Sequence, residues 1–212
     1  GVGGPTGAAD PVQLARYPGH RLDAIIQAML SVSDDEIAET LFRHVALATG
    51  RPASMAGGRA AQRAVLRSLG VPLEGVITSS GSGRSSIDRF SARALVRMLA
   101  VAVDGKHPRM AALRDGTAFT GGLPLMMRAG IDGTLRTAYG RYSTRPSSCA
   151  RGKVYAKTGG LTDAIALSGY AKGSDGRWKV FSVLVNSRPK GYSPLATRQH
   201  VDRIAASVTG CY

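Results

Sequence analysis

The stretch of the sequence best suited to chemistry is Lys157-Thr158-Gly159-Gly160, which ends the apolar run "KVYAKTG". A lysine on a strand that faces a core is unfavourable to bury without a partner. Its ammonium group could support the proton relay of a nucleophile or hold a substrate carboxylate, and the Thr158 hydroxyl could hold the same carboxylate. The two glycines allow another backbone to approach the strand edge closely. One such tripeptide recurs by chance, so it indicates no family by itself.

A second candidate is Ser33, within "SVSDDEIAETLF". Glu36 follows three residues later, which is the capping-box pattern in front of an apolar helical run. The pattern therefore predicts that Ser33 caps a helix. A serine at the start of a helix can also present its hydroxyl to a cleft, so the capping role leaves room for a second one.

The order of these elements indicates a family. S-x-x-K, S-D-N and K-T-G form the motif set of penicillin-binding proteins and serine β-lactamases. Here S-D-D, residues 33–35, precedes K-T-G, residues 157–159. Across about residues 14–187 the chain resembles the D-alanyl-D-alanine carboxypeptidases of the penicillin-binding protein 4 type, serine peptidase family S13. The landmarks are "MLSVSDDEIAETLFRHVA", "SSGSGRSSIDRFSARALVRML", "GGLPLMMRAGIDGTLRTAYG" and "VYAKTGGLTDAIALSGYA".

The resemblance implies a serine carboxypeptidase or endopeptidase that acts on peptidoglycan stem peptides through an acyl-enzyme. It implies an exported protein of the periplasm or cell wall, inhibition by β-lactams, and no metal or other cofactor. Ser33 would relay protons to the leaving group, Lys157 would support the relay, and the N–H of Gly160 would be an oxyanion donor. The implied catalytic residues are Ser33, Asp35 and Lys157, and the implied substrate-binding residues are Thr158, Gly159 and Gly160.

Three departures from the family pattern stand out. The family has asparagine where this chain has Asp35, and a carboxylate cannot donate the amide hydrogen bond to a substrate carbonyl. It could instead form an ion pair with a lysine. The family usually has a hydroxyl residue where this chain has Gly160, and its D-G-S-G-L loop reads here as S-G-S-G-R, with Ser80 and Arg84 at the ends. Asp35 favours an alternative function, that of a non-catalytic peptidoglycan-binding or regulatory relative.

The nucleophile motif S-x-x-K does not precede Ser33. The sequence matches it at "SRPK", residues 187–190, where Pro189 stands inside the turn that should be helical. We interpret that match as a loop. We therefore expect the nucleophile on an upstream N-terminal segment, so that residues 1–212 form the C-terminal part of a single transpeptidase-like domain and are inactive alone.

The elements that must position these residues can be read from periodicity. Apolar spacing predicts helices at residues 19–30, 31–50, 57–71 and 89–103, the last with Ser91 as a possible cap. β-Rich runs follow at 153–159, 164–172 and 178–186, with "GSDG" as a hairpin turn, and helical spacing returns at 194–208. The order predicts an α+β fold, β-lactamase/transpeptidase-like, with a helical part at about 18–135 and, at about 151–210, an antiparallel sheet with a C-terminal helix packed on it.

Composition bears on nucleic-acid binding, metal binding and disulfide formation. The net charge of +14 favours polyanionic partners, which leaves a basic nucleic-acid-binding module as a hypothesis from another class. The arginines are scattered, and aromatic residues make up only 6% of the chain, so we expect no nucleic-acid partner. The histidines show no metal-binding spacing. Cys149 and Cys211 could form one disulfide or remain two thiols, and we expect them to be joined if the protein is exported.

Overall fold

A computed structural model describes residues 15–212, and residues 1–14, which the predicted domain also includes, lie outside the described part. Helices dominate the first half of this part and a sheet dominates the second. The helices of the first half are α1 (Leu22–Val32), α2 (Asp35–Ala48), α3 (Met55–Ser68), α4 (Ala92–Ala102) and α5 (Ala112–Asp115). The later elements are β1 (Met127–Arg128), β2 (Val154–Gly160), β3 (Ile165–Lys172), β4 (Trp178–Val185) and α6 (Pro194–Thr209), with short 3-10 helices at Gly133–Leu135, Thr137–Tyr139 and Ser147–Ala150.

The four strands form one antiparallel sheet in the order β1-β2-β3-β4. The register places Lys157 opposite Ser168, and Ser168 opposite Ser182. The predicted turn at 173–176 joins β3 to β4. Because side chains alternate across a strand, the register decides which residues face each side of the sheet.

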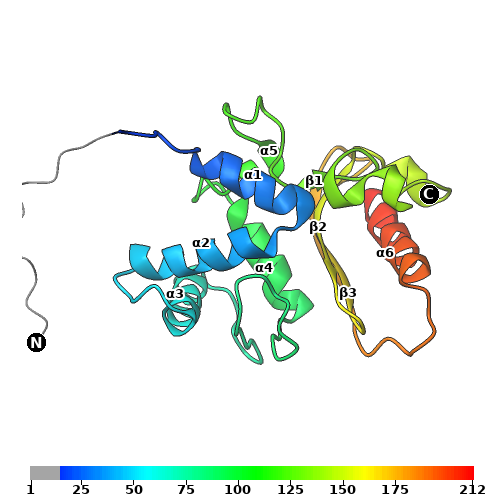
Figure 1. The fold of residues 1–212 in the computed structure, drawn as a ribbon. Coiled ribbons are helices and arrows are strands. Elements are labelled where there is room, and N and C mark those ends of the chain that lie inside the picture. Colours follow the sequence, from blue (N-terminus) through cyan, green and yellow to red (C-terminus); the bar gives the residue numbers. More distant parts are fainter. Residues whose placement is uncertain (1–14) are drawn as a thin grey trace, which may run out of the picture.

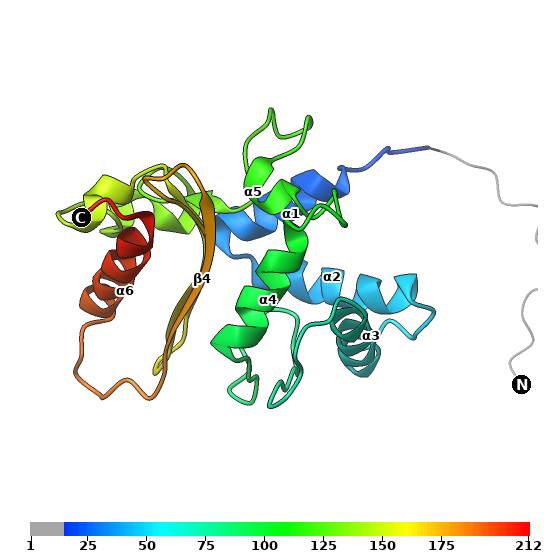
Figure 2. The same ribbon diagram turned by 180° about the vertical axis from the view of Figure 1, so that it is seen from behind.

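Helices cover both faces of the sheet, with α6 on one side and α4 on the other (Figures 1 and 2). Ile165 and Leu167 pack with Val201 in the core cluster on the α6 side. Tyr170, on the opposite face, is buried with Leu99 and donates a hydrogen bond of 2.9 Å to the Leu99 carbonyl. The sheet is therefore the middle layer, and Lys157 lies on the face that looks towards the other helices of the first half.

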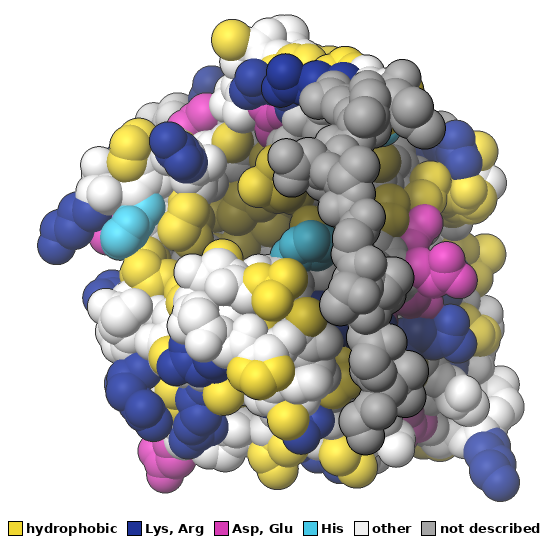
Figure 3. Space-filling view, turned by 60° about the vertical axis from the view of Figure 1, so that its left-hand side comes forward, with side chains coloured by type: hydrophobic (Ala, Val, Ile, Leu, Met, Phe, Trp, Pro, Cys, Tyr) yellow, Lys and Arg dark blue, Asp and Glu magenta, His cyan; other side chains and the backbone are white. Residues whose placement is uncertain are grey.

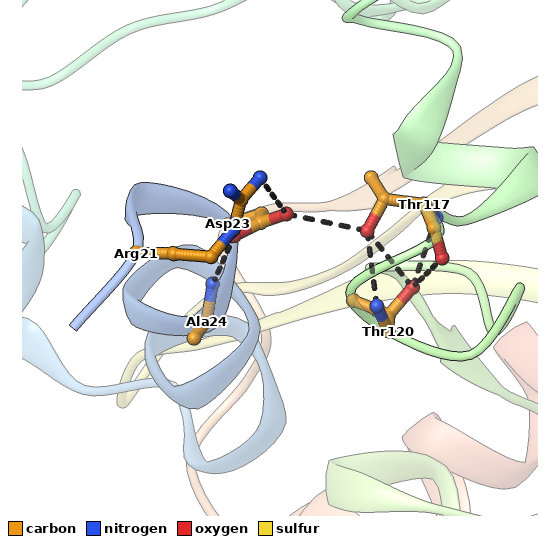
Figure 4. Close-up of polar contacts among 5 residues, drawn as sticks. All are labelled: Arg21, Asp23, Ala24, Thr117 and Thr120. Carbon is orange, nitrogen blue, oxygen red and sulfur yellow. Dashed lines mark hydrogen bonds and ion pairs between the residues drawn. The ribbon is translucent and has the colours of Figure 1, made fainter.

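The N-terminal end of α1 is fixed by Asp23 (Figure 4). Its carboxylate accepts hydrogen bonds from Arg21 (3.3 Å), the backbone of Ala24 (3.1 Å) and the hydroxyl of Thr117 (3.3 Å), which lies in the loop after α5. Partial desolvation works the other way, but these hydrogen bonds and the charge of Arg21 hold the pKa of Asp23 below its ordinary value. A carboxylate in the first turn also suits the positive end of the helix dipole.

Two long-range links join α6 and the residues that follow it to the segment between β1 and β2. Asp202 on α6 is fully buried and accepts hydrogen bonds from the guanidinium of Arg141, the shortest at 2.6 Å, and from the backbone of Tyr142 at 3.3 Å. A disulfide joins Cys149 to Cys211, with 5.9 Å between their Cα atoms. The expected pairing of the cysteines is thus confirmed.

The α+β fold predicted from the sequence is confirmed, and so are the four helices predicted in the first half, the three long strands and the C-terminal helix, whereas the short helix α5 was missed. Ser91 caps α4 by accepting a hydrogen bond from Ala94. The short strand β1 was missed, and it lies within the part predicted to be helical. The boundaries proposed for the two parts stay predictions. Among residues 15–212, no helix has the length and apolar character needed to cross a bilayer.

We expect Asp202→Ala to lower the free energy of unfolding by about 3–5 kcal/mol, because it leaves the Arg141 guanidinium buried without a counter-charge. Asp175→Ala is the matched control, since Asp175 pairs with Arg177, whose side chain is 83% exposed, and it should lower the free energy of unfolding far less, because solvent screens an exposed ion pair. Urea unfolding measures both. Equal losses in the two variants would contradict the structural role of the buried pair.

The double variant Cys149→Ser/Cys211→Ser should be less stable by about 2–4 kcal/mol, because the bridge closes a loop between residues 62 apart and so restricts the unfolded chain. Reductant should lower the stability of the natural chain to that of the variant and leave the variant unchanged. Two thiols titrating in denatured, unreduced protein would show that the bridge does not form.

Candidate active site

A hydrogen bond between Lys157 and Ser33 joins the two sequence motifs in space. The Lys157 ammonium on β2 donates to Ser33 Oγ at 2.7 Å and to the Thr158 carbonyl at 2.8 Å. The two residues are 124 positions apart in the sequence. The structure therefore brings together the lysine and the serine that the motif order predicted as catalytic residues.

Ser33 occupies the turn between α1 and α2 rather than the cap of α2. Its backbone is left-handed, with φ 60° and ψ 53°, and its N–H donates to the Met29 carbonyl at the end of α1. The N-cap of α2 is Asp34, whose carboxylate accepts a hydrogen bond of 2.9 Å from Ile37. The predicted capping box of Ser33 and Glu36 is therefore wrong, because the neighbouring carboxylate takes the capping role. This leaves the Ser33 hydroxyl free to meet Lys157.

The electrostatic state of Lys157 follows from its burial. Desolvation of the ammonium group lowers the pKa of Lys157 below its ordinary value, and the negative charge of Asp35 opposes this shift. A lysine that gives up its proton more easily is suited to proton transfer. Lys157 thus has both the contact and the direction of pKa shift that a relay with Ser33 requires.

The Ser33–Lys157 pair opens into a cleft of about 1150 Å³. One wall is apolar and comes from α1 and α2. The other combines the end of β2 with the loop at 81–84 and arginine side chains. The apolar wall includes Ile26, Met29, Leu41, Phe42 and Val45. No residue of α1 is buried, although most of its side chains are apolar. The cleft therefore offers a polar side for chemistry and an apolar side for packing.

The loop that borders the cleft is held by two carboxylates. Glu39 on α2 accepts hydrogen bonds from the backbones of Gly81 and Ser82, each at 3.0 Å, and from the Ser82 hydroxyl at 2.7 Å. Desolvation opposes the shift, but these hydrogen bonds hold the pKa of Glu39 below its ordinary value. Asp88 receives the hydroxyl of Ser80 at 2.6 Å.

Gly81 is where this loop comes closest to α2. A Cβ built at this position would lie 2.5 Å from the Cβ of Phe42 and 2.7 Å from the carbonyl oxygen of Ala38. Both distances are too short for any side chain without movement of the backbone. Glycine at 81 therefore allows the loop to lie directly against α2.

Asp35 and Arg84, two of the positions that depart from the family pattern, contact each other. The Arg84 guanidinium lies 3.0 Å from the Asp35 carboxylate. The pair is exposed, with 74% of the Arg84 side chain and 39% of the Asp35 side chain accessible. Among residues 15–212 the ion-pair partner of Asp35 is thus this arginine rather than a lysine. Asp35 acts on Lys157 only through its charge.

The predicted substrate-binding residues lie at the free edge of β2. β1 pairs with β2 only at Tyr155 and Ala156, so the edge beyond them has no strand beside it. The carbonyl of Val154 faces β1, and the alternation of an antiparallel ladder then turns the backbone groups of Thr158 and Gly160 to the same side. The Thr158 hydroxyl donates to Thr134 at 2.9 Å, on the sheet face opposite Lys157.

Several residues of the site carry no signal in the sequence. Arg188 and Arg198 line the cleft, yet they look like ordinary surface arginines of a loop and a helix. Thr134 and Glu39 act through contacts 24 and 42 residues away along the chain. The "SRPK" match, by contrast, lies in the loop after β4, as predicted.

Two other kinds of site, for a metal ion and for a nucleic acid, can be compared with the described residues. Within residues 15–212 the structure has no group of three His, Cys, Asp or Glu side chains placed to hold a metal ion. On the face drawn in Figure 3, lysine and arginine side chains form separate groups around a hollow lined by hydrophobic side chains. The described basic side chains on that face therefore do not form the continuous surface on which a nucleic acid would bind.

The sequence of the chain matches a known protein family. The model of the D-Ala-D-Ala carboxypeptidase 3 (S13) family matches residues 1–208. The chain belongs to this family. The resemblance to carboxypeptidases of the penicillin-binding protein 4 type, predicted from four short segments, is confirmed.

Relatives of known name agree with this family. Carboxypeptidase DacB of Mycolicibacterium smegmatis is 31% identical over 208 residues, which cover 98% of this chain and 42% of that protein. A D-alanyl-D-alanine carboxypeptidase of Actinomadura sp. is 28% identical over 204 residues, covering 95% of this chain and 35% of the relative. The S13 chain described here thus spans less than half the length of these relatives.

Solved structures share the fold. Penicillin binding protein 4 of Haemophilus influenzae aligns with a TM-score of 0.70 and 24% identity, over 88% of this chain and 39% of that one. Its complex with a β-lactam aligns with a TM-score of 0.67 and 25% identity, over 88% and 40% of the two chains. A predatory peptidoglycan endopeptidase of Bdellovibrio bacteriovorus gives a TM-score of 0.59 at 17% identity, over 89% and 43%. The transpeptidase-like fold is therefore confirmed.

The lowered pKa of Lys157 predicts a pH dependence of stability. Between the lowered pKa and the ordinary value of 10.5 the unfolded chain binds more protons than the folded chain, so stability rises with pH across this window. Lys157→Met removes this contribution. The stability of the natural chain relative to the variant should therefore rise as the pH increases to 10.5. Urea unfolding of both proteins at several pH values measures this relative stability. If it stays constant or falls as the pH rises, the desolvation of the Lys157 ammonium group is contradicted.

Proposed function

We propose that this chain supplies the Ser33 and Lys157 elements of a serine D-Ala-D-Ala carboxypeptidase or endopeptidase that acts on peptidoglycan stem peptides. The observation that carries the proposal is the 2.7 Å hydrogen bond between Lys157 and Ser33 beside an open cleft. Membership of the S13 family supports the reaction class. The export of the protein to the periplasm or cell wall is part of the same proposal.

The contact suggests how a proton would move. Because Ser33 Oγ accepts the hydrogen bond from Lys157, its own hydroxyl proton is free to point into the cleft. Ser33 would give this proton to the leaving amine of the D-alanine and would receive another from Lys157. The lowered pKa of Lys157 would favour this release, and the neutral lysine would regain a proton from the hydroxyl that attacks the carbonyl.

The free edge of β2 offers a place for the peptide. A substrate lying as an extra strand beside Thr158 and Gly160 would use their backbone groups, as in β-strand addition. The N–H of Gly160 faces this edge and would hold the oxyanion of the tetrahedral intermediate. The scissile carbonyl would then lie next to the Ser33–Lys157 pair.

The nucleophile in this proposal comes from an upstream segment that carries S-x-x-K. The apolar wall of the cleft is formed by α1 and α2, and the unburied apolar face of α1 would be covered by such a segment. The greater length of the relatives supports its existence. A β-lactam would bind as a mimic of the substrate, as a 25% identical solved structure with a bound β-lactam suggests.

A second candidate function is a non-catalytic peptidoglycan-binding relative, and the Asp35–Arg84 ion pair favours it. A carboxylate in place of the family's asparagine removes an amide donor from the cleft. Its pairing with Arg84 occupies the carboxylate that stands in place of that donor. The two functions differ in whether any acyl-enzyme forms.

Acylation by a fluorescent penicillin tests the proposal. We expect no covalent adduct on the isolated chain, and an adduct on the upstream serine when the chain is joined to its S-x-x-K segment. Lys157→Ala in the joined protein should slow acylation by a factor of about 100 to 1,000, because it removes the cation beside the reacting groups. Lys153→Ala, which changes an exposed lysine just before the same strand, is the control.

Each alternative result has its own meaning. An adduct on a serine of the isolated chain would show that no other segment supplies the nucleophile. An unchanged acylation rate in Lys157→Ala would remove Lys157 from the site. No adduct in either protein, with retained binding to peptidoglycan, would favour the non-catalytic relative.

A further inference from the structure

Arg198 on α6 reaches the end of the K-T-G strand. Its Nη2 atom lies 3.6 Å from the position that a Cβ of residue 160 would occupy. Residue 160 is the glycine that stands where the family usually has a hydroxyl residue. The guanidinium thus lies beside the space from which that hydroxyl is missing, and both residues line the cleft.

The other charged groups of the cleft already have partners. Asp34 caps α2, and Asp35 pairs with Arg84. Arg188 donates from both terminal nitrogens to backbone carbonyls, of Tyr192 at 2.9 Å and of Thr162, and only its buried Nε atom has no partner among the described residues. Arg198 makes no hydrogen bond or ion pair with any residue in the part of the chain from 15 to 212. Its guanidinium is therefore available to an anion in the cleft.

The nearby donors do not complete a carboxylate site without Arg198. The Thr158 hydroxyl gives its proton to Thr134. Lys157 directs two of its three N–H groups to Ser33 and to the Thr158 carbonyl. A peptide carboxylate bound at this edge would find one lysine N–H and no side-chain hydroxyl at residue 160. A guanidinium supplies the missing donors as a planar fork that matches a carboxylate.

We propose that Arg198 binds the C-terminal carboxylate of the peptide substrate and thereby replaces the hydroxyl residue that follows K-T-G elsewhere in the family. This inference rests on the proposed function, because it assumes a peptide with a free carboxylate in the cleft. It makes Arg198 a specificity-determining residue: the site selects peptides that end at the second D-alanine. No bond is made or broken at Arg198.

The test compares two ligands that differ only in charge, N-acetyl-D-alanyl-D-alanine and its C-terminal amide. Titrations followed by NMR give the affinity of the 212-residue chain for each. We expect the acid to bind about tenfold more tightly than the amide, the size of one charge-assisted hydrogen bond in a solvent-accessible site. Arg198→Gln should remove this preference.

Two further variants separate direct contact from general charge and from structural damage. Arg203→Gln removes the same charge from an exposed position on the same helix and should keep the preference. Gly160→Ser in the Arg198→Gln background restores a hydroxyl after K-T-G and should recover part of the preference. A purely structural role of Arg198 would not be rescued in this way. Unchanged amide spectra away from the cleft establish that each variant is folded.

The outcomes distinguish the inference from the function on which it rests. If the natural chain prefers the acid and Arg198→Gln prefers it equally, the inference is overturned and the proposed function stands. If the natural chain binds the acid no better than the amide, or binds neither, the inference is overturned, while the proposed function is decided separately by acylation of the protein joined to its S-x-x-K segment. If Arg198→Gln and Arg203→Gln both lose the preference, the preference arises from the general positive charge of the helix and not from contact with Arg198. That result would also overturn the inference.

Discussion

The position of the Lys157 ammonium group is the constraint on which the rest of the site depends. Burial disfavours its charge, and its partners come from both layers of the molecule: the Thr158 carbonyl on the sheet and the Ser33 hydroxyl between α1 and α2. The lysine can keep both only if the helices of the first half stay docked on the sheet. The contact between Lys157 and Ser33 and the docking of the two layers therefore depend on the same interaction.

A small polar framework keeps the helical layer in the geometry that Lys157 requires. Asp34 fixes the start of α2, so that the preceding Ser33 adopts a left-handed backbone and turns its hydroxyl to the sheet. Glu39, one turn further along α2, holds the loop at 81–84. Both carboxylates accept backbone N–H groups, which anchors segments without filling the cleft. A cleft of this size can persist next to the half-buried Lys157 because hydrogen bonds on the far side of its walls hold the helix start and the loop in place.

Much of this arrangement could be predicted from the sequence, because it depends on local patterns. Apolar spacing located the helices and strands, and the order of S-D-D and K-T-G predicted that Ser33 and Lys157 meet. The capping of α2 was mispredicted because Ser33 and Asp34 are adjacent and either could cap the helix. The buried pair of Arg141 and Asp202 was missed because it joins residues 61 apart with no local signal. Such contacts depend on tertiary packing, which the spacing of apolar residues along the sequence cannot predict.

The departures from the family pattern look unrelated in the sequence, yet two of them, Asp35 and Gly160, each lie beside an arginine in space. The carboxylate of Asp35 is neutralised by Arg84, which stands where the family has an apolar residue. The missing side chain at Gly160 leaves room beside the guanidinium of Arg198. An acid gained and a hydroxyl lost would each weaken a site that binds a carboxylate, the first by repulsion and the second by removing a donor. Arginines at both places restore positive charge and donors, which is what a cleft that still binds an anionic peptide end would require.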